Sequence, residues 1–267
     1  MENIKEYIEK KKKLIKEEIE QYSKKPKLVI VQVNDDPASN AYIKGKIKDL
    51  NEVGAISELI KLPITSTQDE LLSLINKLNN DVSVDGFIVQ MPLPKQINEE
   101  IIKKAVNPKK DVDGFNILSD LNPATPKGII TFLEDNNYSF DGKNALVIGR
   151  SNIVGRPIAK MLLDHNMNVT VVHSHTSRKD LSNFIKNSDL IVVAIGEPYF
   201  INDEFEFKKD AVIFDVGISR IDGKLCGDCE PNLNVDFQSP VPGGVGLLTR
   251  LSLILNLMEV YKNEIWN

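Results

Sequence analysis

The sequence predicts an α/β protein with two domains, and two observations support this prediction. Apolar runs rich in β-branched residues alternate with segments whose apolar residues recur at helical spacing, as in parallel strands joined by right-handed helical crossovers. A proline-punctuated stretch at 123–126 interrupts the pattern, and 267 residues suffice for two medium domains. We place the first domain in residues 1–122 and the second in residues 123–245. We expect the C-terminal helix, 246–267, to return to the first domain.

Composition narrows the classes of function. The chain is 42% hydrophobic and 27% charged, as is typical of a soluble globular protein. A net charge of −5, with no concentrated basic face beyond the N-terminal lysines, argues against a nucleic-acid partner. No apolar run approaches the roughly 18 residues that span a membrane, and residues 1–25 are too charged for a secretory signal. We therefore expect a cytoplasmic protein without a membrane partner.

The first half begins with a charged amphipathic helix at 2–24, in which lysines 10–13 are expected to face solvent. A buried strand follows at 27–33. A helix then starts at Asp36-Pro37, because aspartate caps a helix N-terminus and proline suits its first position. The next predicted elements are a strand at 56–62, a helix at 68–78 and a strand from 85 that enters the proline-rich turn 92–94.

Four polar side chains of this half are candidates for chemistry. Tyr42 and Lys46 are four residues apart and share one helix face. Gln90 is polar and stands near the C-terminal end of its strand, where ligands collect in open α/β sheets. Asp113 lies in a glycine-containing loop with Asp111. Each group also has a structural interpretation: a solvated lysine beside a half-buried tyrosine, a satisfied edge amide, and a surface turn.

The second half opens with a strand, a turn and a helix. The apolar run 145–148 stops at Gly149, a short polar turn follows, and helical spacing begins at Ile153. This unit directs helix N–H groups and the helix dipole at a phosphate. It departs from G-x-G-x-x-G, because Ser151 replaces the second glycine and Gly155 comes one residue late. By itself the motif does not separate nucleotide binding from an ordinary turn. Further strands are predicted at 169–172, 190–195 and 211–216.

The end of the predicted strand 169–172 indicates which dinucleotide would bind. An NAD site usually has an acidic residue there, about 20 residues past the glycines, to hold the ribose 2′-hydroxyl. This chain instead has His173-Ser174-His175, and Arg150 stands beside the glycine turn. Arginine and serine suit a 2′-phosphate, so the pattern favours NADP. We interpret the histidines as solvent-exposed rather than as metal ligands.

Two further stretches need interpretation. Cys226 and Cys229 form a single C-x-x-C that follows a turn into a short strand and opens no helix. We interpret them as packing residues rather than as a redox pair or half a zinc site, and we predict no metal. The glycines within 240–246 follow two prolines and allow the backbone to approach a ligand closely, and an apolar helix follows from Leu247 to about Tyr261.

Seven stretches, taken in order, resemble the bifunctional methylenetetrahydrofolate dehydrogenase/methenyltetrahydrofolate cyclohydrolase family. Any one of them is modest evidence, but seven in family order over most of the chain are specific. Departures are few, among them Ala124 where cysteine is frequent and Leu247 where proline is usual. The matching stretches are Asp36 to Ser39 with Tyr42 and Lys46, Gly86 to Pro94, Lys110 to Phe115, Gly149 to Pro157, His173-Ser174, Asp215 to Ile218, and Pro240 to Gly246.

The resemblance implies an enzyme that is usually a homodimer, with tetrahydrofolate derivatives as substrates between the domains and NADP on a Rossmann-type second domain. It implies that Lys46 is the essential catalytic residue, that Tyr42 stacks on the folate, that Gln90 tunes Lys46 and that Asp113 binds the pterin. For NADP it implies Gly149, Arg150, Ser151, Ser174 and Ile218. The remaining substrate-lining residues that it implies are Val89, Met91, Pro242, Gly243, Gly244, Val245 and Gly246.

The implied reactions are oxidation of 5,10-methylenetetrahydrofolate by NADP and hydrolysis of the methenyl product to 10-formyltetrahydrofolate. Two alternatives stay open at this point: a relative that has kept only the dehydrogenase, and a non-catalytic NADP-binding regulator. One set of four residues argues against the regulator: Tyr42, Lys46, Gln90 and Asp113. Sequence does not decide whether Lys46 acts as a base or as a cation.

Overall fold

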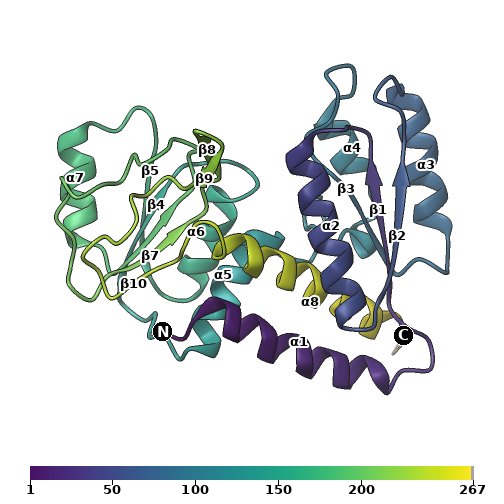
Figure 1. The fold of residues 1–267 in the computed structure, drawn as a ribbon, viewed down its shortest axis with the longest axis horizontal. Coiled ribbons are helices and arrows are strands. Elements are labelled where there is room, and N and C mark those ends of the chain that lie inside the picture. The colour runs from purple at the N-terminus through teal and green to yellow at the C-terminus, as the bar shows by residue number, and fades with distance from the viewer. Residues whose placement is uncertain (266–267) are drawn as a thin grey trace. The chain divides into compact units, whose positions relative to one another are not determined.

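The computed structural model describes residues 1–265, which fall into two compact units (Figure 1). We name them by their main sheets. The three-stranded unit comprises Glu9–Ala124 and the chain from Arg250 onward, and the five-stranded unit comprises Met1–Ile8 and Thr125–Thr249. The last two residues of the predicted segment 246–267 lie outside the described residues.

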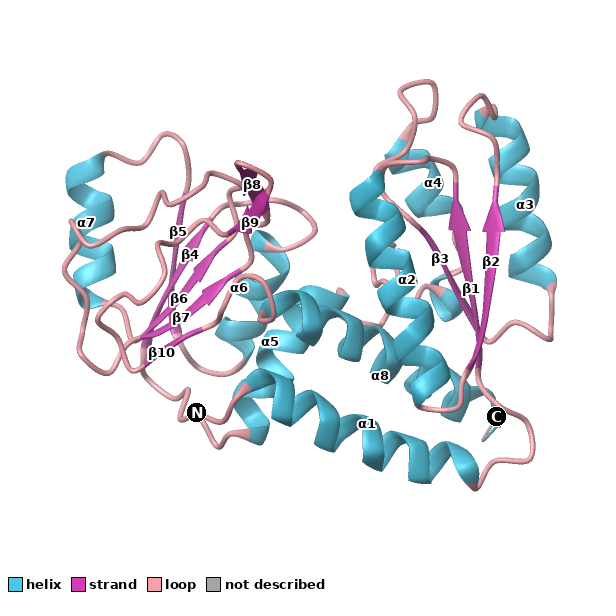
Figure 2. Ribbon diagram, in the orientation of Figure 1, coloured by secondary structure: helices cyan, strands magenta, loops and turns pink. Residues whose placement is uncertain are grey.

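Helices and strands alternate along most of the chain, as predicted (Figure 2). The helices are α1 (Ile4–Glu20), α2 (Pro37–Glu52), α3 (Gln68–Asn80), α4 (Glu99–Ala105), the 3₁₀ turn η1 (Pro108–Lys110), α5 (Ala124–Asp135), α6 (Gly155–Asp164), α7 (Arg178–Asn187) and α8 (Val245–Ile265). The strands are β1 (Lys27–Gln32), β2 (Ile56–Lys61), β3 (Gly86–Val89), β4 (Asn144–Ile148), β5 (Asn168–Val172), β6 (Leu190–Val193), β7 (Val212–Asp215), β8 (Ser219–Ile221), β9 (Lys224–Cys226) and β10 (Phe237–Gln238).

The three-stranded unit has a parallel sheet in the order β2-β1-β3, with Lys27 opposite Ile56 and Leu28 opposite Gly86. Alternate residues of β1 point to one face, where Val29 and Val31 pack with apolar residues of α3 and α4. The predicted strands of this half are all present. Sequence reasoning missed α4, which begins at an Asn98 cap and contributes Ile102 to this core.

The C-terminal helix joins the same unit through a buried amide. Asn256 is fully buried on α8, and its Nδ2 donates to the carbonyls of Val112 (2.8 Å) and Asn122 (3.1 Å). Leu257 lies next to Gly86 of β3, where any side chain at position 86 would collide with Val112. The predicted return of this helix to the first half of the chain is therefore confirmed.

Position 12 in α1 differs from its prediction. Lysines 10–13 were expected to face solvent, but the Lys12 side chain is only 15% exposed. Its amine donates to the carboxylate of Asp49, which is buried on α2, and to Glu52 at 2.8 Å. Asp49 also forms an ion pair with Arg250 at 2.9 Å. The amphipathic pattern located the helix correctly, but it could not show which lysine meets a buried acid.

The five-stranded unit has the parallel order β10-β7-β6-β4-β5, with a separate β8-β9 hairpin after β7. Its core joins the sheet to α7 through residues such as Ile191, Ile213 and Ile185. The strands β6 and β7 are each shorter than predicted. Beyond β6, the N–H groups of Ile195 and Gly196 donate to a side chain, so the chain leaves the sheet there.

No helix in residues 1–265 combines the length and the apolar character that crossing a membrane would require.

Candidate functional site

The amine of Lys46 is the centre of the candidate site. Helix α2 starts where the sequence predicts: the carboxylate of Asp36 accepts the N–H of Ser39 at 2.8 Å, and Pro37 occupies the first turn. The predicted helix face forms, with the Lys46 amine 5.1 Å from the centre of the Tyr42 ring. Lys46 is only 5% exposed, so the interpretation of a solvated lysine is wrong.

Two side chains from other parts of the three-stranded unit approach this amine. Gln90 directly follows β3, and its Oε1 accepts a hydrogen bond from Lys46 Nζ at 3.2 Å. Its Nε2 donates to the Met91 carbonyl at 2.8 Å, which keeps the oxygen end of the amide toward the lysine. Asp113 Oδ1 lies 4.0 Å from the same Nζ. The structure thus brings together all four residues that were predicted to be catalytic.

The electrostatics of this group are unusual for a lysine. Burial lowers the pKa of Lys46, and the nearby Asp113 carboxylate opposes that shift only in part. Burial raises the pKa of Asp113, with Lys46 acting in the opposite direction. Gln90 carries no charge, so it holds the amine without placing a second carboxylate beside it. Burial thus favours the neutral form of the amine, the form that can accept a proton, more than water does.

The loop that carries Asp113 is organised by its neighbour Asp111. Asp111 is buried, accepts the N–H of Asn116 at 2.7 Å, and has its pKa raised to about 6, mainly by burial. Gly114 has a φ of +68°, and a side chain there would collide with the backbone at Asn122. The interpretation of the two acids as a surface turn is therefore wrong. Sequence reasoning missed the structural role of Asp111, although the glycine directly after the second acid signalled a constrained loop.

A pocket of about 560 Å³ lies at the C-terminal ends of β4, β5 and β6 in the five-stranded unit. Two glycines shape the adjoining turn. Gly149 has a φ of +116°, and a Cβ there would lie 2.4 Å from the carbonyl oxygen of Ala194. A Cβ at Gly155 would lie 2.3 Å from the carbonyl oxygen of Gly149, so the helix can approach the strand only without a side chain. The late glycine still has the packing role of the motif's third glycine.

Polar groups around this pocket suit an anionic cofactor. Arg150 and Ser174 line the pocket and are exposed to solvent. Arg178, which sequence reasoning missed, also lines the pocket and is exposed. The Ser151 hydroxyl accepts hydrogen bonds from the N–H groups of Val154 and Gly155, which stand at the start of α6. Among the described residues no aspartate lines the pocket, and Glu197 after β6 is the one acidic residue that does. The pocket therefore fits a dinucleotide with a 2′-phosphate better than one with a bare ribose.

Other predicted site residues lie as follows. Val89 is buried in β3, and Met91 is half-buried beside Gln90. Ile218 follows β7 and is 60% exposed. The segment Pro242 to Gly246 belongs to the five-stranded unit, where a Cβ at Gly244 would lie 2.3 Å from the Pro240 carbonyl oxygen. This turn thus needs a glycine for its own geometry, and its contact with substrate stays a prediction.

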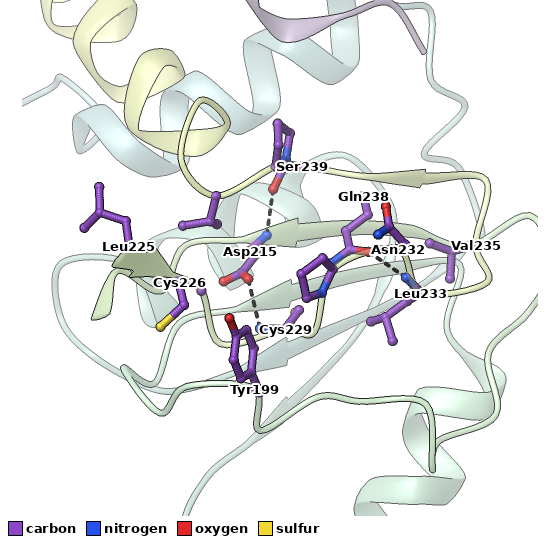
Figure 3. A pocket seen from close by; sticks show the side chains of 14 residues that line it. Tyr199, Asp215, Leu225, Cys226, Cys229, Asn232, Leu233, Val235, Gln238 and Ser239 are labelled. Carbon is purple, nitrogen blue, oxygen red and sulfur yellow. Dashed lines mark hydrogen bonds between the residues drawn. The ribbon is translucent and has the colours of Figure 1, made fainter. Parts of the chain in front are cut away.

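The cysteines are buried and unpaired, as the packing interpretation requires. They line a second pocket of about 410 Å³, shown in Figure 3, whose walls also include Tyr199 and Asp215. The Cys229 N–H donates to Asp215 Oδ2 at 2.9 Å, and burial raises the pKa of the Cys229 thiol. A buried thiol of raised pKa is a poor nucleophile and a poor metal ligand.

Comparison with known proteins places these features in context. The model for "Tetrahydrofolate dehydrogenase/cyclohydrolase, catalytic domain" matches residues 2–113, and the model for the NAD(P)-binding domain of the same family matches residues 123–265. A bifunctional protein FolD of Agathobacter rectalis is 45% identical over 264 residues, which cover 93% of this chain and 94% of that protein.

Two solved structures extend the comparison. The bifunctional FolD methylenetetrahydrofolate dehydrogenase/cyclohydrolase of Campylobacter jejuni has a TM-score of 0.88 and 38% identity, over 98% of this chain and 95% of that one. The Trypanosoma brucei methylenetetrahydrofolate dehydrogenase-cyclohydrolase, solved with NADP and an inhibitor, has a TM-score of 0.91 and 27% identity, over 99% and 98%.

Replacing both cysteines with valine is expected to leave enzymatic activity near that of the unaltered protein, because valine preserves the apolar packing and no chemistry uses the thiols. Activity and the thermal midpoint should be measured on the same sample, and thiol titration of the unaltered reduced protein should find two free thiols. A large loss of activity in a folded valine variant would contradict the packing interpretation.

Proposed function

The chain belongs to the tetrahydrofolate dehydrogenase/cyclohydrolase family and is an NADP-dependent bifunctional enzyme, and we propose that its hydrolytic chemistry depends on the neutral amine of Lys46. It oxidises 5,10-methylenetetrahydrofolate to the methenyl form and hydrolyses that product to 10-formyltetrahydrofolate. The observation that carries the proposal is the buried amine, which donates to the uncharged Gln90 and lies 4.0 Å from the Asp113 carboxylate.

Hydrolysis requires proton transfer at two points. Water adds to the methenyl carbon, and the Lys46 amine takes a proton from that water as the bond forms. The hydroxyl group of this adduct then loses its proton and becomes the formyl C=O as the bond from the carbon to the ring nitrogen breaks. That nitrogen takes up a proton and the formyl group remains on the other nitrogen, so the whole reaction releases one proton. A lysine whose pKa is lowered by burial is suited to this exchange near neutral pH.

The dehydrogenase step needs alignment more than proton transfer. When bound, NADP supplies the acceptor for the hydride that leaves the methylene carbon. We propose that Gly149, Arg150, Ser151 and Ser174 bind it in the pocket of the five-stranded unit, with Ile218 beside it. Tyr42 stacks on the folate and Asp113 binds its pterin, so that the protein contributes mainly orientation.

The wider assignments follow from the same family membership. We propose a folate-binding domain of residues 1–122 and 246–267 and an NADP-binding domain of residues 123–245. We also propose a homodimer in the cytoplasm, without nucleic-acid or membrane partners; sedimentation at several concentrations tests the oligomeric state. The dehydrogenase-only alternative has no supporting observation, because the relative and the solved structure at 38% identity or more are both named as bifunctional.

Lys46→Met is expected to remove most cyclohydrolase activity, on the order of the 10²–10⁴-fold that acid–base groups contribute. Dehydrogenase activity should fall less, because hydride transfer needs no proton acceptor. Gln90→Ala should show the same ordering in weaker form, since it acts through the lysine. Both rates are measured on one preparation, with NADP affinity as the check on the other domain. Full cyclohydrolase activity in Lys46→Met would show that the catalytic assignment is wrong.

Asp113→Asn is expected to move the acidic limb of the cyclohydrolase pH profile to lower pH. The carboxylate of Asp113 favours the protonated amine, so its removal lowers the pKa of Lys46 further and keeps the amine neutral in more acidic solution. The profile of kcat is the proper measurement, because Asp113 is also expected to bind substrate. Asp35→Asn removes an exposed acid of the same unit and should leave the limb in place. A limb that moves to higher pH would contradict Lys46 as the base.

Arg150→Ala is expected to weaken NADP binding by about tenfold or more and to change NAD binding little, since a charge-assisted hydrogen bond contributes about 1.5–3 kcal/mol. Cofactor titrations with the purified protein measure both affinities. Arg156→Ala is a matched control, because Arg156 is an exposed arginine on α6 that does not line the pocket. If the unaltered protein binds NAD and NADP equally well, this account of cofactor choice fails.

A further inference from the structure

Asp228 is a fully buried carboxylate that none of the steps above uses. Its Oδ2 accepts two backbone hydrogen bonds, from the N–H of Ile195 at 2.8 Å and from the N–H of Gly196 at 3.0 Å. Both donors belong to the turn after β6, and Ile195 lines the cofactor pocket. One carboxylate oxygen therefore holds a wall of that pocket in place.

The other oxygen of Asp228 lies against a second turn. A Cβ at Gly217 would be only 2.1 Å from Asp228 Oδ1, so the carboxylate occupies the space that a side chain at position 217 would need. Gly217 lies after β7 and directly before Ile218. Within residues 1–265, Oδ1 has no hydrogen-bond partner. Only one of the two oxygens of this buried carboxylate is therefore hydrogen-bonded.

A second acid, Asp215, holds the backbone of both Gly217 and Asp228. Asp215, at the end of β7, accepts the N–H groups of Gly217 at 3.0 Å and of Asp228 itself at 2.9 Å. Figure 3 shows Asp215 with its bonds to Ser239 and Cys229, at the wall of the second pocket. The backbone of Asp228 is thereby attached to one strand end while its side chain holds the neighbouring turn.

We propose that Asp228 is a positioning residue for the cofactor: it fixes the turns after β6 and β7 in the conformation that binds NADP. In parallel α/β sheets the cofactor binds at the carboxyl ends of the strands, which is where both turns lie. If the turns are ordered before NADP binds, binding does not carry the entropic cost of ordering them. Removal of the Asp228 carboxylate should therefore weaken cofactor affinity. The inference rests on the proposed NADP site and adds a residue to it that touches no ligand.

The test compares two Asp228 variants and a matched control by KM for NADP, by kcat, and by direct NADPH titration. Asp228→Ala removes the acceptor of both turn N–H groups and should raise KM and the dissociation constant about tenfold or more. Asp228→Asn keeps an acceptor oxygen and should stay within about threefold of the unaltered protein. Cyclohydrolase activity without NADP should persist in both variants, because Lys46 lies in the other unit.

Asp189→Ala is the matched control. Asp189 is also largely buried in the five-stranded unit and accepts a backbone N–H, that of Asn144 at 2.7 Å, together with the Lys208 amine. It stands at the amino ends of β4 and β6, opposite to the end where the cofactor binds. Its loss should lower the thermal midpoint and leave KM for NADP unchanged. Equal KM changes in Asp189→Ala and Asp228→Ala would show that Asp228 is only structural.

Gly217→Ala keeps the proposal testable if Asp228→Ala fails to fold. The added methyl group must displace the Asp228 carboxylate, so the variant should also weaken NADP binding about tenfold. In the double variant with Asp228→Ala the methyl has room, and the two effects should not add. Additive effects, or unchanged NADP affinity in both single variants, would overturn the proposal. Absence of NADP binding by the unaltered protein would instead overturn the proposed cofactor site.

Discussion

Parallel pairing of short, buried strands is the constraint on which both units depend. Every pair in the two main sheets is parallel, so the loops that follow the strands gather at one edge of each sheet. In the three-stranded unit this edge carries Gln90, directly after β3. In the five-stranded unit it carries Gly149, Ser174 and Ile218. The chemistry of each unit is thereby set by which residues end its strands.

The two units meet opposite electrostatic requirements. The lysine site withdraws one amine from water and gives it an amide partner, which leaves its protonation state open to change. The pocket at the ends of β4, β5 and β6 leaves Arg150 exposed, and a fixed positive charge in contact with solvent needs no buried partner and is available to an anionic ligand. One environment adjusts a pKa and the other keeps a permanent charge accessible.

Local signals in the sequence were sufficient where chemistry and geometry coincide at neighbouring residues. The Asp36-Pro37 start of α2, the four-residue spacing of Tyr42 and Lys46, and the glycine turn after β4 each follow from near-neighbour rules. Groups that depend on partners far along the chain were missed. Asp111 and Asp228 look like loop acids in the sequence, and their burial becomes visible only in the folded chain, where Asp228 accepts the N–H of Ile195, 33 residues away.

The burial of Lys46 has a consequence for the stability of the fold. The pKa of Lys46 is lower in the folded chain than in the unfolded chain. Lys46 therefore decreases the free energy of unfolding, and this decrease grows as pH falls from the ordinary pKa of a lysine toward the pKa in the folded chain. An apolar residue of similar length would fit the same space without that cost. The protein therefore retains, in the core of its three-stranded unit, a residue that selection for stability alone would remove.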